Sequence, residues 1–260
     1  MDVVQLLVLA LVQGIAEFLP ISSSGQLIVV RGLYESWGYS LDEPLTVTIV
    51  LHAGTLGSVL VVYWKRIVRL LTVDRRVCFL LAVGTLPAVI VGMPLKWYAA
   101  DLLIAPLLTG CMLPVTGILL LWSGHYTEGD IPYIQMTFRQ ALIIGIFQAV
   151  AILPGISRSG ATISAGLWVG LRREDSATFS FLLSIPTISG ACLWEFLHLL
   201  RQPSPVQSLG FLAFFALVAF LVGILALYFL LRLLSVGRLH WFAYYCFMLG
   251  GLVIVWQLSI

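Results

Sequence analysis

The sequence predicts an all-α, polytopic membrane protein, and two observations lead to that fold class. The chain of 260 residues is 60% hydrophobic and only 10% charged, whereas an ordinary soluble domain carries about 25% charged residues. It also contains several apolar runs of about 18 residues or more, which is enough to cross a ~30 Å hydrocarbon core as a helix. We therefore expect transmembrane helices at 45–64, 77–95, 102–123, 177–200, 209–231 and 240–260.

Two further apolar segments, 1–30 and 139–171, are each interrupted near the middle by a proline and several hydroxyl residues. The first break contains Pro20 and the second contains Pro154. Such a break leaves backbone groups unpaired, which is tolerated at membrane depth only where the backbone is buried in protein or lines a wet cavity. We predict that both segments are re-entrant helix hairpins that return to the side they entered.

These elements divide one integral membrane domain into two related halves. The first half, 1–123, has one hairpin followed by three spans, and the second half, 139–260, repeats that order. Three spans is an odd number, so the second hairpin must enter from the opposite side of the membrane. The sequence therefore predicts two inverted-topology repeats whose broken helices meet near the midplane.

The distribution of basic residues gives an independent topology. Cytoplasmic loops of membrane proteins are enriched in lysine and arginine. If the 65–76 loop is cytoplasmic, the inner side receives ten basic residues, namely Lys65, Arg66, Arg69, Arg75, Arg76, Arg139, Arg172, Arg173, Arg232 and Arg238. The outer side then keeps three, namely Arg31, Lys96 and Arg201. This bias places both termini outside.

The two hairpin breaks carry similar strings with opposite charges. The first runs from Gln13 through Glu17 and Pro20 to a serine cluster, and the second places Arg158 within Ser157-Arg158-Ser159-Gly160. An ionisable group at membrane depth is a functional hypothesis by default, because burying it costs roughly 2.5–3.5 kcal/mol on insertion scales. We expect the two breaks to form one polar site, with Glu17 as a catalytic residue or metal ligand.

The second break has the chemistry of an anion receptor. Loop amides at a helix N-terminus, hydroxyl groups and an arginine together suit a phosphate group. We expect Arg158 to be catalytic and Ser23 to be a nucleophile or phosphate contact. The remaining predicted phosphate-binding residues are Gln13, Ser22, Ser24, Gln26, Ser157, Ser159 and Thr162. Neither a Walker lysine nor a Gly-x-Ser-x-Gly elbow accompanies them, so a nucleotide P-loop and a serine hydrolase are not indicated.

Other features point to packing rather than chemistry. His52 lies inside the 45–64 span, where a histidine is more often a hydrogen-bonded structural residue than a catalyst. The cysteines Cys78, Cys111, Cys192 and Cys246 have no metal-binding spacing and are expected to be free. The net charge of +2 and the lack of a long basic tract indicate no nucleic-acid partner.

The two motifs resemble the signatures of the bacterial undecaprenyl pyrophosphate phosphatase family. Those signatures place Glu or Gln four residues before a Glu and read Pro-Gly-x-Ser-Arg-Ser-x-x-Thr; this chain has Gln13 and Glu17, and Pro154 through Thr162. The likeness extends to His52-Ala-Gly-Thr-Leu and to Gly84-Thr-Leu-Pro-Ala. One departure is Gln26, which stands where many members of the family carry a histidine. Glutamine cannot act as a general base, so this departure argues against a mechanism centred on that histidine.

The resemblance implies hydrolysis of undecaprenyl diphosphate to undecaprenyl phosphate and inorganic phosphate, which recycles a lipid carrier for cell-wall synthesis. It also implies bacitracin resistance, a divalent cation such as Mg²⁺ or Ca²⁺ held by Glu17, a polyprenyl diphosphate substrate and membrane lipids as partners, with a homodimer as a candidate assembly. We expect a multi-pass protein of the bacterial inner membrane whose active site opens to the outer, periplasmic side. The competing hypothesis is an inverted-repeat transporter or flippase of a polyprenyl phosphate or phospholipid that uses the same site only for binding.

Overall fold

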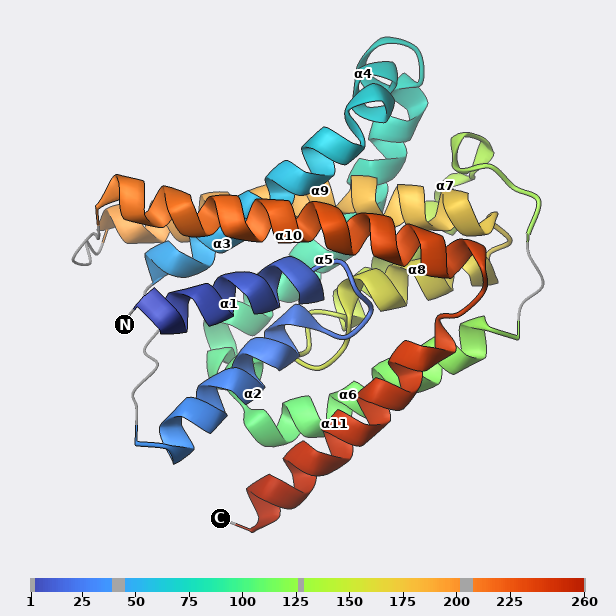
Figure 1. The fold of residues 1–260 in the computed structure, drawn as a ribbon. Coiled ribbons are helices and arrows are strands. Elements are labelled where there is room, and N and C mark those ends of the chain that lie inside the picture. Colours follow the sequence, from blue (N-terminus) through green and yellow to red (C-terminus); the bar gives the residue numbers. More distant parts are fainter. Residues whose placement is uncertain (1–2, 39–44, 126–128, 202–207, 260) are drawn as a thin grey trace.

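The computed structural model describes residues 3–38, 45–125, 129–201 and 208–259, and these residues form a bundle of helices without a β-strand (Figure 1). The helices are α1 (Val3–Ala16), α2 (Ser23–Ser36), α3 (Leu45–Val62), α4 (Trp64–Thr72), α5 (Arg75–Tyr98), α6 (Pro106–Ser123), α7 (Phe138–Val150), α8 (Arg158–Trp168), α9 (Arg173–Arg201), α10 (Leu209–Ser235) and α11 (His240–Leu258). Two short 3₁₀ helices, Ala100–Ile104 and Tyr133–Gln135, lie in connections.

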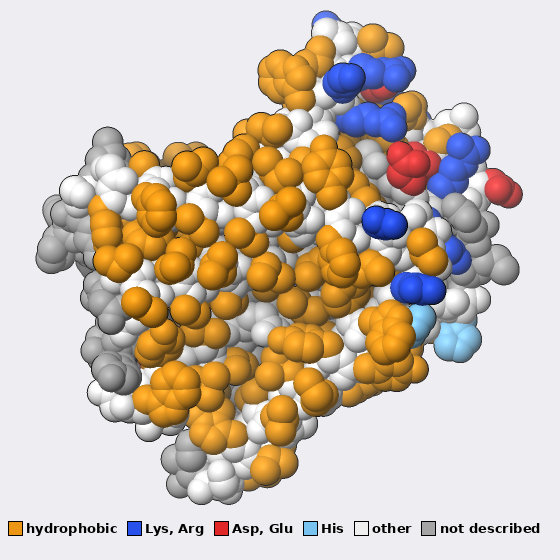
Figure 2. All heavy atoms as spheres, viewed as in Figure 1, with side chains coloured by type: hydrophobic (Ala, Val, Ile, Leu, Met, Phe, Trp, Pro, Cys, Tyr) orange, Lys and Arg blue, Asp and Glu red, His pale blue; other side chains and the backbone are white. Residues whose placement is uncertain are grey.

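The predicted class, an all-α polytopic membrane protein, is confirmed. Helices α5, α6, α9, α10 and α11 are each long and apolar enough to cross a membrane, and α3 qualifies together with α4, from which it is bent by 73°. Their exposed side chains are largely apolar, and these side chains cover the face shown in Figure 2. An apolar outer surface is what a bilayer requires of a polytopic helical protein.

The loop predicted at 65–76 is the clearest error, because most of it is helix α4. One side of this helix carries the charges of Lys65, Arg66 and Arg69, while Leu70 on another side is only 4% exposed. This amphipathic pattern stabilises a short helix that packs its apolar stripe on the bundle and leaves its charges outside. The number of charged residues at 65–76 suggested a loop, but in α4 the charges occupy only one face of the helix.

Several span boundaries also differ from those predicted. Helix α5 exceeds the predicted 77–95 at both ends and continues through Pro87 and Pro94. Membrane helices tolerate such prolines because neighbouring helices satisfy the freed backbone groups. Helix α6 begins at Pro106 instead of at 102, since proline suits the first position of a helix, where its missing N–H is not needed. Helix α9 begins at Arg173, before the predicted 177.

The first helix of each predicted hairpin is too short to span a bilayer. Helix α1 has 14 residues and α7 has 13, so each is roughly 20 Å long at ~1.5 Å per residue, against a ~30 Å hydrocarbon core. Each then breaks, and the chain resumes as α2 or α8. Helices α1 and α7 therefore both end inside the bundle, as the two predicted hairpins require.

The two hairpins enter the bundle from opposite ends. The side chains of α1 pack with the first turns of α3 and α10, including Val47, Leu51 and Leu212. Phe138, at the start of α7, instead packs edge-on against Phe79 near the start of α5, with ring centroids 5.2 Å apart. Moreover, α1 lies against α10 of the second half and α7 lies against α5 of the first half. Inverted repeats are expected to pack the first helix of each half against the other half in this way. The orientation of the repeats in the membrane stays a prediction.

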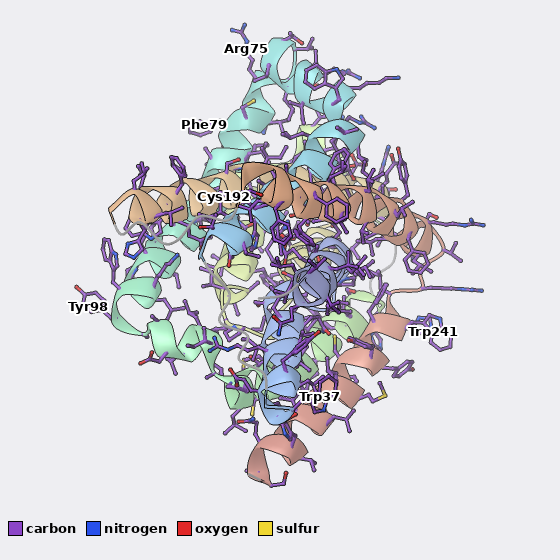
Figure 3. The ribbon with its side chains drawn as sticks, turned by 60° about the vertical axis from the view of Figure 1, so that its left-hand side comes forward. Trp37, Arg75, Phe79, Tyr98, Cys192 and Trp241 are labelled. Atoms are coloured by element: carbon purple, nitrogen blue, oxygen red, sulfur yellow. The ribbon has the colours of Figure 1, made fainter. Side chains whose placement is uncertain are left out.

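The basic residues gather at one end of the molecule, which we call the basic end. Figure 2 shows blue side chains concentrated there, around α4 and the end of α10, while the opposite side of that view has none. Figure 3 labels Arg75 at this end and places Trp37 and Tyr98 away from it. The distribution is the one that the lysine and arginine bias predicts for a cytoplasmic face.

We expect single cysteines at the two ends of the bundle to be labelled from opposite sides of the membrane. In a cysteine-free background, Val73→Cys and Val236→Cys report on the basic end, and Tyr98→Cys reports on the other; these side chains are 72%, 59% and 87% exposed. The measurement is labelling of intact cells by a membrane-impermeant maleimide before and after permeabilisation. Only Tyr98→Cys should react in intact cells, and labelling of Val73→Cys and Tyr98→Cys from the same side would contradict the topology.

Candidate active site

The site lies where the breaks of the two hairpins touch. The Ser22 hydroxyl accepts a hydrogen bond from the Gly155 backbone N–H at 3.1 Å, and the Ser159 hydroxyl donates to the Leu19 carbonyl at 3.3 Å. Each contact joins one half of the chain to the other. A backbone that leaves the helical ladder inside a membrane must find such partners, so each break supplies the polar groups that the other needs.

A serine caps the helix that follows each break. Ser22 Oγ accepts from the Gly25 N–H at 3.3 Å at the start of α2, and Ser157 Oγ accepts from the Gly160 N–H at 3.1 Å at the start of α8. Ser22 has a φ of +65°, which is sparsely populated for a residue with a side chain. Both helices therefore begin in the centre of the protein, where their N-terminal partial charges favour an anion.

Glu17 and Arg158 form the ion pair at the centre of the site. Arg158 Nη2 donates to Glu17 Oε1 at 2.7 Å, and Glu17 Oε2 accepts from Gln13 Nε2 and from the Ser23 hydroxyl, both at 3.0 Å. Glu17 is only 8% exposed. Arg158 Nη1 is also buried but has no hydrogen-bond partner. A buried guanidinium with an unused donor is prepared to bind a further anionic oxygen.

The ion pair faces a cavity of about 180 Å³ between the two breaks, α3 and α9. The predicted site residues in its wall are Glu17, Ser22, Ser23, Ser24, Ser157 and Arg158. The other wall residues are mostly apolar and include Ala151, Ile156 and Ile188. Six residues taken from two motifs about 135 positions apart thus meet in one cavity, as the sequence predicted for the site.

His52 is a further polar residue of the cavity wall, although the sequence pattern favoured a structural role for it. Its Nδ1 lies 2.9 Å from the Thr48 carbonyl oxygen. A carbonyl can only accept, so Nδ1 is the donor of this hydrogen bond. This contact orients the imidazole and leaves Nε2 as its other polar atom at the cavity wall.

Four of the predicted phosphate contacts lie outside the cavity wall, namely Gln13, Gln26, Ser159 and Thr162. The Thr162 hydroxyl donates to the Arg158 carbonyl at 2.8 Å and lies 2.6 Å from the Ser180 hydroxyl. Ser159 Oγ binds the Leu19 carbonyl and lies 3.1 Å from Ser157 Oγ. These contacts favour a bracing role for both residues, since their hydroxyls are used within the protein.

Gln26, which also lies outside the cavity wall, joins the first hairpin to the last helix. Its Nε2 donates to the Ile21 carbonyl at 2.9 Å, and its Oε1 accepts from the Tyr245 hydroxyl at 2.7 Å. Both ends of the amide are therefore engaged. The Gln26 amide therefore links the first break to α11. Because its donor and its acceptor are both used within the protein, this arrangement gives Gln26 no part in proton transfer.

The oxygen donors around Glu17 fit a hard divalent cation shared with a phosphate ligand. Among the described residues, no three His, Cys, Asp or Glu side chains gather into a metal-binding group. However, Gln13 Oε1 is buried without a hydrogen-bond partner next to Glu17, and the Ser23 hydroxyl is adjacent. Mg²⁺ is commonly held by one or two carboxylates together with substrate phosphates, and this donor set matches that pattern.

Sequence reasoning missed the support of the second break by α6. Thr116 Oγ1 donates to the Gly155 carbonyl at 2.8 Å and accepts from the Ser157 N–H at 2.9 Å. Gly155 has a φ of +94°, and a Cβ atom added there would lie 2.5 Å from the Thr109 carbonyl oxygen. The glycine is therefore required both by the backbone and by the close approach of α6. No local signal marks Thr109 or Thr116 as part of the site.

Comparison with known proteins places the whole chain among related sequences. A family model described as bacitracin resistance protein BacA matches residues 6–252. A relative from Rhodopirellula baltica, named undecaprenyl-diphosphatase, is 49% identical over 258 residues, which cover 99% of both chains. Proteins of the same name from Desulforapulum autotrophicum and Methanosphaera stadtmanae are 37% and 35% identical, each over 98% of both chains.

We expect Gly155→Ala to destabilise the protein more than Gly38→Ala. Both glycines have a positive φ, +94° and +82°, but a Cβ at Gly38 meets nothing within 4 Å. Gly38→Ala therefore adds only the backbone strain of about 1–3 kcal/mol, whereas Gly155→Ala adds a clash with α6. The measurement is the midpoint of thermal unfolding in detergent. Equal midpoints would show that α6 does not hold the second break in place.

Proposed function

The chain belongs to the bacitracin resistance protein BacA family, and from that premise we propose that it hydrolyses undecaprenyl diphosphate to undecaprenyl phosphate and inorganic phosphate. The protein is a multi-span membrane enzyme acting on a lipid diphosphate, and its product returns a lipid carrier to cell-wall synthesis. The observation that carries the proposal is Arg158, whose buried Nη1 has no partner while Nη2 holds Glu17 at 2.7 Å. This geometry supports phosphate binding next to a carboxylate.

The terminal phosphate is bound by groups that both halves contribute. Arg158 supplies the fixed positive charge, and its Nη1 group, which has no partner within the protein, donates to a phosphate oxygen while Nη2 holds Glu17. The N-termini of α2 and α8 add backbone dipoles, and the hydroxyls of Ser24 and Ser157 lie in the same wall. Donors that are already in place stabilise the charge that develops on the transferring phosphoryl group without reorganising during the reaction.

Glu17 is positioned to accept a proton from the nucleophile. The Ser23 hydroxyl donates to Glu17 Oε2 at 3.0 Å, which is within the distance required of a general base. In the serine path, Ser23 Oγ bonds to the terminal phosphorus, its proton passes to Glu17, and the bridging P–O bond breaks to release undecaprenyl phosphate. Water then hydrolyses the phosphoserine. In the alternative path, a water held by Glu17 attacks directly.

We also propose Mg²⁺ or Ca²⁺ as the cofactor. Glu17, Gln13 Oε1 and the Ser23 hydroxyl would hold the ion together with oxygens of the diphosphate, since hard cations prefer oxygen ligands. Bound there, the ion would neutralise phosphate charge. Gln13 orients the carboxylate for this purpose, because its Nε2 holds Glu17 Oε2 while its Oε1 remains unpaired.

The placement of the cavity supports an active site that opens on the outer side of the inner membrane. His52 lies in the first half of α3, and Ala191 lies in the second half of α9. Both positions are nearer the end of the bundle opposite the basic end. If the basic end is cytoplasmic, the cavity lies closer to the periplasm. No contact among the described residues favours the transporter hypothesis over hydrolysis.

The direct test is phosphate release from the purified protein with undecaprenyl and farnesyl diphosphates, with and without a chelator. We expect orthophosphate from both substrates, loss of release in EDTA, and recovery when Mg²⁺ or Ca²⁺ is added in excess. Binding of the lipid without any release would favour transport and contradict the phosphatase. Release that EDTA leaves unchanged would overturn only the cofactor proposal.

We expect Glu17→Gln to abolish turnover, whereas His52→Ala retains most of it. Glutamine keeps the shape and the hydrogen bond to Ser23 as an acceptor, but it removes the negative charge and the proton acceptor. His52 lies in the wall, yet its removal leaves the ion pair intact. The measurement is kcat for phosphate release. Loss of at least ~10³-fold in both variants, with both still folded, would identify His52 as the base in place of Glu17.

A further inference from the structure

An apolar groove lies between α5 and α9, next to the candidate active site. Its volume is about 380 Å³, within the range of about 300–1,000 Å³ usual for ligand sites. Apolar residues make up most of its lining, including Val89, Met93 and Ile152. Figure 3 shows α5 running from Arg75 past Phe79 to Tyr98, with Cys192 marking α9 in the same view.

The groove and the phosphate cavity share part of their walls. Thr187 and Ala191 line both of them, and Ala151 of the cavity is followed by Ile152 of the groove. An elongated ligand whose head lies at Arg158 can therefore continue past Thr187 into the groove. By contrast, the cavities at the basic end, around Tyr63 and around His240, share no lining residue with the phosphate cavity.

The floor of the groove is made of small residues. Ala88, Gly92, Gly190 and Ala191 contribute no bulky side chain. A Cβ built at Gly190 meets nothing within 4 Å, so the space above this glycine is open. The lipid-facing side chains of Val89 and Met93 are 44% and 40% exposed, which leaves the groove open sideways toward the bilayer.

The far end of the groove reaches the membrane interface. Lys96 lies in its lining and pairs with Glu195 at 3.3 Å, and Trp97 packs against Trp194 with ring centroids 5.8 Å apart. Tryptophan and lysine are typical of the boundary between hydrocarbon and headgroups. The groove thus extends from the buried phosphate cavity to the outer edge of the hydrocarbon core.

We propose that this groove between α5 and α9 binds the isoprene units next to the diphosphate and guides the rest of the chain into the bilayer. This inference rests on the proposed function. We assign each carbon atom with its hydrogens about 30 Å³, the volume of one water molecule in the liquid. The groove of about 380 Å³ then has room for roughly two to three isoprene units of five carbons each. The remainder of a longer chain lies in lipid, where it adds little to recognition. Gly190 is then a residue that determines specificity for the tail.

The test fills the groove with a side chain and compares substrates of different tail length. Gly190→Phe places a ring in the open space, and Gly251→Phe is the matched control, because Gly251 also lies inside a helix with nothing within 4 Å of its Cβ. The substrates are farnesyl diphosphate, with three isoprene units, and dimethylallyl diphosphate, with one. Steady-state kinetics of phosphate release gives KM and kcat for each pair.

We expect Gly190→Phe to raise KM for farnesyl diphosphate at least about tenfold, since each apolar group excluded from a pocket is worth roughly 10–200-fold in discrimination. KM for dimethylallyl diphosphate should stay within about threefold of wild type. Gly251→Phe should match wild type on both substrates. Met93→Trp, which narrows the groove from α5, should act in the same direction if Gly190→Phe proves unstable.

Two outcomes overturn the inference while leaving the phosphatase intact. One is equal KM values for Gly190→Phe and Gly251→Phe with farnesyl diphosphate. The other is an equal increase for both substrates, which would mean that the ring obstructs the phosphate cavity instead of the tail. Failure of the proposed function has a different signature, because the wild-type protein would then release no phosphate from either substrate.

Discussion

The ion pair between Glu17 and Arg158 is the interaction on which the rest of the structure depends. The two charges lie 2.7 Å apart at side-chain exposures of 7% and 15%. Neither is stable alone at this depth, because an unpaired buried charge is far more costly than a paired one. Since one charge comes from each half of the chain, the pair forms only when both hairpin breaks reach the centre. It therefore couples the assembly of the two halves to the formation of the site.

The hydroxyl groups around the pair satisfy the two interrupted helices while leaving donors for a ligand. Ser22 and Ser157 each cap a helix, and Ser22 also reaches Gly155 across the junction. Thr116 of α6 forms hydrogen bonds with the backbone of both Gly155 and Ser157 in the second break. Serine and threonine suit this work, because a hydroxyl donates and accepts at once. Arg158 Nη1 is buried without a hydrogen-bond partner. This missing hydrogen bond destabilises the ligand-free protein, and a bound phosphate oxygen would supply it.

Local sequence patterns were sufficient to predict the approximate spans and the two breaks and to single out Glu17 and Arg158, but not the ion pair that joins these two residues. Apolar runs indicate helices by composition alone, and Glu17 and Arg158 stand out because charges are rare in such a chain. Helix α4 was missed, since its charges were counted without their position on the helix. The contacts of Gln26 with Tyr245 and of Gly155 with Thr116 join residues far apart in the sequence. Such contacts arise from the packing of whole helices, and so does the groove between α5 and α9.

The central claim is that Arg158 receives the phosphate while Glu17 serves the chemistry. It is tested most directly by the dissociation constant of a non-hydrolysable, methylene-bridged farnesyl diphosphate analogue, measured without divalent ions. Glu17→Gln and Arg158→Gln are matched variants, because each replaces one charge of the pair by the same neutral amide. Arg158→Gln should weaken binding at least about tenfold, which is ~1.4 kcal/mol, whereas Glu17→Gln should bind as tightly as wild type or more tightly, because it frees the guanidinium. Unchanged binding in Arg158→Gln would contradict the account.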